Sequence, residues 1–197
     1  MNKAIVAAFA LATLLAGTWS QAQQAPTRIR GIINTASGDM IAVKIGDGKN
    51  VDVQLSEKTT ITFAQPIALT DIKSGDFLGV TSVKRKDGTL AAYDVRRFVK
   101  PTNPGHRPFD GRDDQTMTNA TVSATVQSAT GRELALSYEG GSQKVVVPEG
   151  AAITTLVPGN RSQLLPGSYV SLLAEPDGAG KLTARSIEVR KDAPKAP

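Results

Sequence analysis

The chain has 197 residues, of which 40% are hydrophobic and only 5% aromatic, as in one or two small globular domains with aliphatic cores. It has no cysteine, which excludes disulfides, thiolate nucleophiles and cysteine metal sites. The formal net charge is +5, and basic clusters such as Lys84 to Lys86 leave an anionic partner open. Few aromatic residues lie beside these charges to stack on bases, so nucleic acid is not the expected partner.

The N-terminus has the pattern of a secretory signal peptide at residues 1–22. Lys3 precedes an apolar run from Ala4 to Gly17, and Ser20 and Ala22 are small residues of the kind that signal peptidase requires. The run has 14 residues, whereas a helix needs about 20 apolar residues to span a bilayer. We therefore predict cleavage after Ala22, a mature form without a transmembrane anchor, and a periplasmic or secreted location.

The remaining sequence aligns with itself at an offset of 92 or 93 residues. The pattern predicts two copies of one module, at residues 28–98 and 117–191, joined by a Pro/Gly-rich linker at residues 99–116. A disordered tail is expected at residues 192–197. The matched positions include Thr35 to Gly38 with Ser128 to Gly131, Ile41 with Leu134, Ile61 with Ile153, Gly75 with Gly167, Phe77 with Tyr169, and Val95 with Ile187.

Each module alternates apolar and polar residues over short runs that Gly-containing turns separate, which indicates β-strands. A single helical turn is expected around residues 69–72, and the second module repeats the order. The expected core residues are Ile41, Val43, Val53, Phe77, Val80, Leu134, Leu136, Val145, Tyr169 and Leu172. In the first module, strands are expected near residues 29–35, 41–45, 51–55, 61–63 and 77–83, followed by a last strand that contains Leu90, Ala92 and Val95.

The last strand of each module changes its side-chain phase. Leu90 and Ala92 are two residues apart and would point to the same face of the strand, whereas Val95 would point to the opposite face. In the second module, Leu182 and Ala184 share one face and Ile187 falls on the other. Such a change requires an inserted residue, so we predict β-bulges near Tyr93-Asp94 and near Arg185-Ser186. Bulges let a small sheet close on itself. The expected fold is all-β, with two tandem five- to six-stranded OB-like barrels.

Several motifs resemble those of an uncharacterised family of exported bacterial proteins with tandem small OB-like β-barrel domains of unknown function. They are the segment from Ala68 to Phe77, the turn from Asp87 to Leu90, and the linker segments from Gly105 to Pro108 and from Met117 to Ala120. The resemblance covers both modules. It implies the fold and the exported location, but no activity, since the family has none that can be transferred.

The residue inventory predicts no catalytic, cofactor or metal site. His106 is the one histidine, so neither a histidine-centred triad nor a site with several histidine ligands can be built from one chain. Asp110, Asp113 and Asp114 follow it, and a cation site in the linker therefore stays an alternative. Their spacing lacks the periodic ligand pattern of an EF-hand loop. A hydrolytic or transfer enzyme is the other alternative, although no motif marks one.

The expected function is that of a non-enzymatic binding or protein-interaction module. Its partner would be a periplasmic protein or an anionic envelope component. The linker has 18 residues, whereas typical connections have about 4 to 6. We expect His106, Arg107, Phe109 and Asp110 to pack into the groove between the barrels, to fix the angle between them and to line the partner site.

Overall fold

A computed structural model describes residues 25–128, 131–177 and 179–195, which form an all-β fold. The predicted signal peptide lies outside the described residues. Two short 3-10 helices, η1 (Leu69–Asp71) and η2 (Arg161–Gln163), precede β5 and β12, and η1 lies within the predicted helical turn. The strands are β1 (Thr27–Ser37), β2 (Met40–Lys44), β3 (Asn50–Gln54), β4 (Thr60–Pro66), β5 (Phe77–Lys84), β6 (Leu90–Phe98), β7 (Gly105–Phe109), β8 (Arg112–Ser128), β9 (Gly131–Tyr138), β10 (Gly141–Val147), β11 (Ala152–Pro158), β12 (Tyr169–Pro176) and β13 (Leu182–Arg190).

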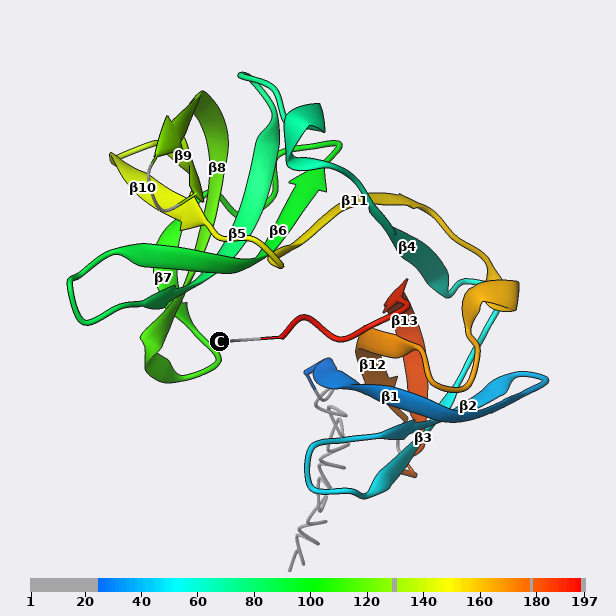
Figure 1. Cartoon of the computed structure of the whole chain (residues 1–197). Coiled ribbons are helices and arrows are strands. Elements are labelled where there is room, and N and C mark those ends of the chain that lie inside the picture. The colour runs from blue at the N-terminus through cyan, green and yellow to red at the C-terminus, as the bar shows by residue number, and fades with distance from the viewer. Residues whose placement is uncertain (1–24, 129–130, 178, 196–197) are drawn as a thin grey trace, which may run out of the picture.

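Ten of these strands form two closed five-stranded barrels. Barrel A runs β1, β2, β3, β13 and β12 in order of pairing, and β12 pairs back with β1. Barrel B runs β8, β9, β10, β6 and β5, and β5 pairs back with β8. The barrels appear as two lobes, and β4 and β11 cross between them (Figure 1).

Each barrel takes strands from both halves of the chain. Barrel A combines β1 to β3 with β12 and β13, and barrel B combines β8 to β10 with β5 and β6. This pairing differs from the prediction that residues 28–98 and residues 117–191 each close a barrel of their own. The cause is the path of β4 and β11. These strands stay extended and pair with each other, Ala64 opposite Leu156, so each carries its half of the chain into the other lobe.

The two barrels repeat one pairing scheme at an offset of 92 residues. Phe77 pairs with Phe98 in barrel B, and Tyr169 pairs with Arg190 in barrel A. Gly75 and Gly167 occupy equivalent turns, where each backbone N–H donates to the first strand of its barrel, at Val122 and Ile33 respectively. Both glycines have positive φ, 92° and 90°, a conformation that side chains with a Cβ rarely adopt.

Both predicted bulges are confirmed. In barrel B, Thr81 pairs with Asp94 while Ser82 pairs with Ala92, which leaves Tyr93 as the inserted residue. In barrel A, Arg185 is skipped in the same way. A further pair of bulges skips Asn34 in β1 and Ser123 in β8, so these strands match at an offset of 89 residues. The sequence alignment at 93 residues there was wrong, because the second hairpin is longer.

Each barrel encloses its own apolar cluster. Nine of the ten predicted core residues are buried, and Tyr169 is only partly buried. Phe77 and Tyr169, at equivalent positions, both lie outside the two clusters. Both clusters draw on the two halves of the chain. The cluster in barrel A is Ile29, Ile33, Ile41, Val43, Val53, Leu55, Leu164, Val170, Leu172, Ala174, Ala184, Ile187 and Val189. The cluster in barrel B is Ile72, Leu78, Val80, Leu90, Ala92, Val95, Ala120, Val122, Leu134, Leu136, Val145 and Val147.

The segment between the halves contains regular structure. Within residues 99–116, β7 forms a hairpin with the start of β8, which begins at Arg112 and not near the predicted Met117. Two backbone carbonyl groups, of Thr102 and Asn103, accept hydrogen bonds of 3.0 Å from the side-chain amide of Asn119. These contacts hold the segment against barrel B.

Candidate functional site

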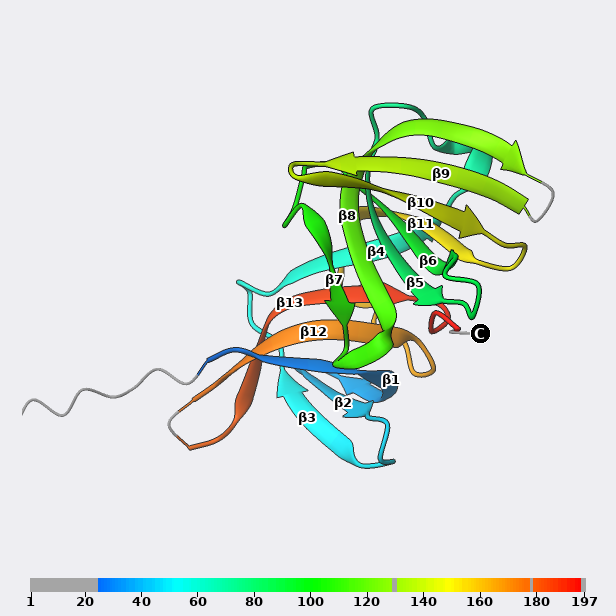
Figure 2. The same ribbon diagram turned by 90° about the vertical axis from the view of Figure 1, so that its left-hand side faces the viewer.

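A cleft of about 470 Å³ lies where the two barrels meet. We call it the inter-barrel cleft. Residues of β1 and β12 line it from barrel A, residues of β5, β6 and β8 line it from barrel B, and residues of β7 and its turn complete the lining. Figure 2 shows β7 beside β8, with one end near β1 and β12. The lining residues of the cleft are Arg28, Arg30, Thr81, Tyr93, Asp94, Arg96, Arg107, Phe109, Asp110, Arg112, Gln115, Met117, Tyr169, Ser171 and Pro194.

The β7 hairpin connects the two barrels at the edge of this cleft. Arg30 of β1 forms an ion pair with Asp110 at the turn after β7. The same guanidinium lies over the ring of Phe109, with 5.1 Å between Cζ and the ring centroid, a cation–π contact. The hairpin therefore touches barrel A through Arg30 while its backbone pairs with barrel B.

Barrel B contributes buried polar side chains to the cleft. The Tyr93 hydroxyl forms a hydrogen bond of 3.1 Å with Oε1 of Gln115, and Thr81 is buried beside them. Burial raises the pKa of Tyr93 to about 12, and the neighbouring charges of Asp94 and Asp110 add to the rise. The bulge has a direct role here, because it lets the consecutive residues Tyr93 and Asp94 both line the cleft.

Four charged residues link β6 of barrel B to β13 of barrel A. Arg96 contacts Glu188 at 2.7 Å and Asp94 at 3.2 Å. Arg190 contacts Asp94 at 3.0 Å and Glu188 at 3.1 Å. The side chains of Arg190 and Asp94 are 4% and 8% exposed, so this inter-barrel ion network is shielded from solvent. It lies beside the cleft, which Asp94 and Arg96 also line.

Three of the four linker residues expected at the groove line the cleft, namely Arg107, Phe109 and Asp110. His106 does not line it. It alternates with Arg107 and Phe109 along β7, and its Nδ1 lies 2.8 Å from Oγ1 of Thr118 in a hydrogen bond. Burial lowers the pKa of the imidazole. The alternation was not foreseen because the segment was expected to be an irregular linker.

Two of the three linker carboxylates that suggested a cation site, Asp110 and Asp114, contact arginines. Asp110 pairs with Arg30, and Asp114 pairs with Arg112 at 2.9 Å. Arg112 holds the pKa of Asp114 below its usual value through the side-chain hydrogen bond. Within residues 25–128, 131–177 and 179–195, no three His, Asp or Glu side chains come together as metal ligands.

Sequence reasoning missed most of the residues from barrel A and the partners of Tyr93. Arg28, Arg30, Tyr169 and Ser171 come from strands that are far from the linker in the chain. One signal was present. Tyr169 was expected in a core by analogy with Phe77, but its hydroxyl group requires a polar neighbour or solvent, and it is partly buried at the cleft.

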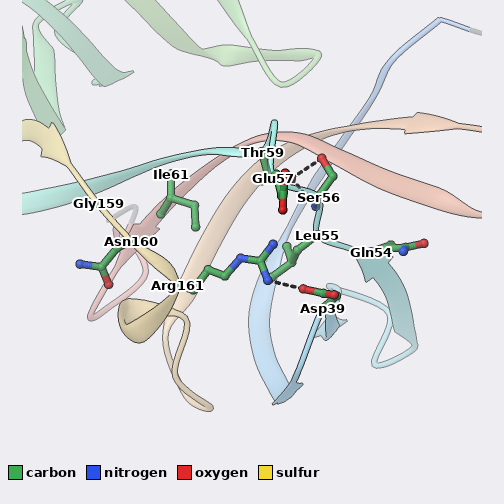
Figure 3. Close-up of a pocket in the computed structure, with 10 residues that line it drawn as sticks. All are labelled: Asp39, Gln54, Leu55, Ser56, Glu57, Thr59, Ile61, Gly159, Asn160 and Arg161. Atoms are coloured by element: carbon green, nitrogen blue, oxygen red, sulfur yellow. Dashed lines mark hydrogen bonds and ion pairs between the residues drawn. The ribbon is translucent and has the colours of Figure 1, made fainter.

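A second pocket, of about 730 Å³, lies where β3 leads into β4 and β11 leads into η2 (Figure 3). Arg161 forms an ion pair there with Asp39, and the side chains of Gln54, Glu57 and Asn160 add polar groups. The equivalent place in barrel B is a smaller pocket of about 280 Å³, where Leu69 replaces Arg161 and Arg132 replaces Asp39. We take the inter-barrel cleft as the candidate site because residues of both barrels and of the β7 hairpin line it, and five of these residues are arginines.

Within the described residues no helix is long and apolar enough to cross a membrane. No protein-family model, curated protein or solved structure matches this chain.

Proposed function

We propose that this is an exported, non-enzymatic binding protein that holds its partner in the inter-barrel cleft. The mature chain would begin at Gln23 after signal cleavage and act in the periplasm or outside the cell. Its partner would be an anionic envelope component or a periplasmic protein. The observation that carries the proposal is a cleft that needs both barrels and the β7 hairpin for its walls.

The architecture belongs to the same proposal. We infer that the chain arose by duplication of one small OB-like barrel unit, whose copies have exchanged halves. The recurrence of the same pairs, turns and bulges at an offset of 92 residues supports this inference. OB-like barrels often bind ligands along a sheet face and the adjoining loops, and the cleft uses both kinds of surface.

The chemistry of the cleft favours binding over catalysis. Acid–base work needs a group that can exchange its proton near neutral pH. Burial raises the pKa of Tyr93 to about 12, far from neutral, and the two carboxylates of the cleft, Asp94 and Asp110, form ion pairs with arginines. Side chains that are already paired and fixed suit a preformed binding surface.

The proposal is tested by replacing residues 103–114 with a Gly/Ser segment of equal length. This change removes β7 and its contacts with Arg30 but leaves every strand pair of both barrels. Mature protein purified from its native compartment should carry a bound species in native mass spectrometry, and the replaced variant should lose it. A control, Lys84→Gln/Lys86→Gln, changes the exposed turn after β5 and should retain it. Equal occupancy in both variants would place the site elsewhere.

A further inference from the structure

We propose that the ligand of the inter-barrel cleft is an acidic sugar, whose carboxylate is held by Arg28 and Arg107. This inference rests on the proposed function and adds the chemical class of the ligand. It starts from the charge of the lining, which contains five arginines and two aspartates. Glu188, Asp114 and Arg190 lie outside the lining and pair with Arg96, Arg112 and Asp94 respectively. The two positive charges that remain attract anions and select against cationic ligands.

In the part of the chain that the structure describes, two of the lining arginines have no carboxylate partner, and they come from different elements, β1 and β7. Arg30, Arg96 and Arg112 each have a carboxylate partner. Among the described residues, Arg28 and Arg107 have none. Arg28 of β1 reaches only the hydroxyl of Ser171, at 3.5 Å, and Arg107 of β7 donates to the carbonyl oxygen of Asn103 at 3.1 Å. A carboxylate between them would contact barrel A and the β7 hairpin together, in charge-assisted hydrogen bonds.

Packing does not explain the cation at position 28. In barrel B the equivalent strand position is occupied by Met117, and both residues line the cleft. Arg28 pairs with Leu173, and Met117 pairs with the equivalent Thr81. The uncharged Met117 therefore meets the packing requirement of this position in barrel B. In barrel A the guanidinium of Arg28 is available to bind a ligand.

The neutral lining indicates a hydrophilic ligand with hydroxyl groups. Thr81, Gln115 and Ser171 offer hydroxyl and amide groups, and Tyr169 adds a ring beside them. The large hydrophobic side chains that are exposed in the described part of the chain all lie outside the cleft: Ile32, Met40, Val99 and Leu165. Phe109, Met117 and Pro194 are the apolar members of the lining, which otherwise consists of charged and polar side chains and the two tyrosines. Sugar hydroxyls and a carboxylate match these groups better than a lipid or a flat membrane surface does.

The test measures binding of two trisaccharides to the mature chain by titration calorimetry at low ionic strength. Trigalacturonate carries carboxylates, and maltotriose is a neutral sugar of the same size. We expect trigalacturonate to bind at least about tenfold more tightly than maltotriose, because each charge-assisted hydrogen bond contributes more than a neutral one. The double variant Arg28→Gln/Arg107→Gln should bind trigalacturonate at least about tenfold more weakly.

A matched control separates the site from the overall charge. Lys84→Gln/Lys86→Gln removes the same two charges from the turn after β5, away from the cleft lining, and should change the affinity less than about twofold. Far-ultraviolet circular dichroism checks that all variants are folded. An equal loss in both double variants would show unspecific surface attraction and overturn the proposal.

The remaining outcomes distinguish this inference from the proposed function. If both sugars bind equally and Ser171→Trp blocks both, the cleft binds ligands but the carboxylate assignment is wrong. If neither sugar binds at millimolar concentration, or if only vesicles of phosphatidylglycerol bind, the acidic-sugar assignment is wrong. In each of these cases the species found by native mass spectrometry still decides whether the cleft is a binding site.

Discussion

Arg96 of β6 and Glu188 of β13 occupy the same position of two equivalent strands, 92 residues apart, and bind each other at 2.7 Å. In a symmetric pair of identical units, such a contact would bring two like residues together. Here the two halves of one chain carry opposite charges, and the contact is an ion pair. Ala64 and Leu156 are likewise equivalent and face each other. The equivalent positions 96 and 188 therefore carry residues of opposite charge, which attract each other where identical residues would repel.

The ion pair should contribute measurably to stability. The side chains of Arg96 and Glu188 are 21% and 15% exposed, so solvent screens them weakly. In a double-mutant cycle with Arg96→Ala and Glu188→Ala, we expect a coupling energy of about 1 to 3 kcal/mol in urea unfolding. The pair Arg185 and Glu175 is the control, because it is 3.6 Å apart and more than half exposed. Its coupling should stay below about 0.5 kcal/mol. Similar values for the two cycles would contradict the shielding argument.

The exchange of halves predicts which residues can be cross-linked. Ile32 lies in the first half of the chain and pairs with Tyr169 of the second half. The residue of the first half that is equivalent to Tyr169 is Phe77. The chain has no cysteine, so two introduced cysteines can form only one disulfide within a molecule, and dilute protein keeps disulfides between molecules rare. Ile32→Cys/Tyr169→Cys should form it on oxidation, since paired strand positions have suitable Cα separations. Ile32→Cys/Phe77→Cys should stay reduced, and the reverse result would show that each half closes on itself.

Local features of this fold were predictable from the sequence. Alternation located most strands, and a broken phase located the bulges at Tyr93 and Arg185. Gly75 and Gly167 marked equivalent turns. Each of these sequence patterns spans only a few residues, and the local backbone geometry of a strand, bulge or turn is its direct cause.

The choice of strand partners was not predictable in the same way. β1 meets β12 where an unexchanged fold would use β5, and Phe77 and Tyr169 are aromatic residues in equivalent positions of those two strands. The core positions of the two strands are also alike: Leu78 and Val80 of β5 correspond to Val170 and Leu172 of β12, and all four are buried, so the apolar pattern does not distinguish the two arrangements. The same ambiguity hid the cleft, because Arg30 and Phe109 come together only when β1, β12 and the β7 hairpin are placed around one site.

Tyr93 should lose its proton later than an ordinary tyrosine. Burial, followed by the charge of Asp94, raises its pKa from 10.0 to about 12. The unfolded chain releases this proton near pH 10 while the folded chain keeps it, so the contribution of Tyr93 to stability falls as the pH rises from about 10 to about 12. Titration of the tyrosinate absorbance should show a late step that Tyr93→Phe removes. Tyr93→Phe should also flatten the alkaline decrease in stability. A late step that persists in the variant would assign it to Tyr169, whose pKa burial also raises.

The two halves of the chain should stay bound to each other when the connection between them is cut. Val99 is 85% exposed and lies between β6 and β7, where an inserted protease site would be accessible. Each barrel takes strands and core residues from both sides of this point. Cutting the folded full chain there should therefore leave the two fragments bound to each other.

The measurement is size-exclusion chromatography of the cut protein, with the uncut chain as its standard. We expect one peak at the uncut position under native conditions and two fragments only in denaturant, because separation would expose both apolar clusters to water. A control cut is made in the turn between β5 and β6, at Asp87-Gly88, which interrupts a hairpin within barrel B. It shows whether the fragments also stay together when a single barrel is cut. If cutting after Val99 instead released two folded species of half the size, each half would be a self-contained barrel, and the cleft would be held together by the linker alone.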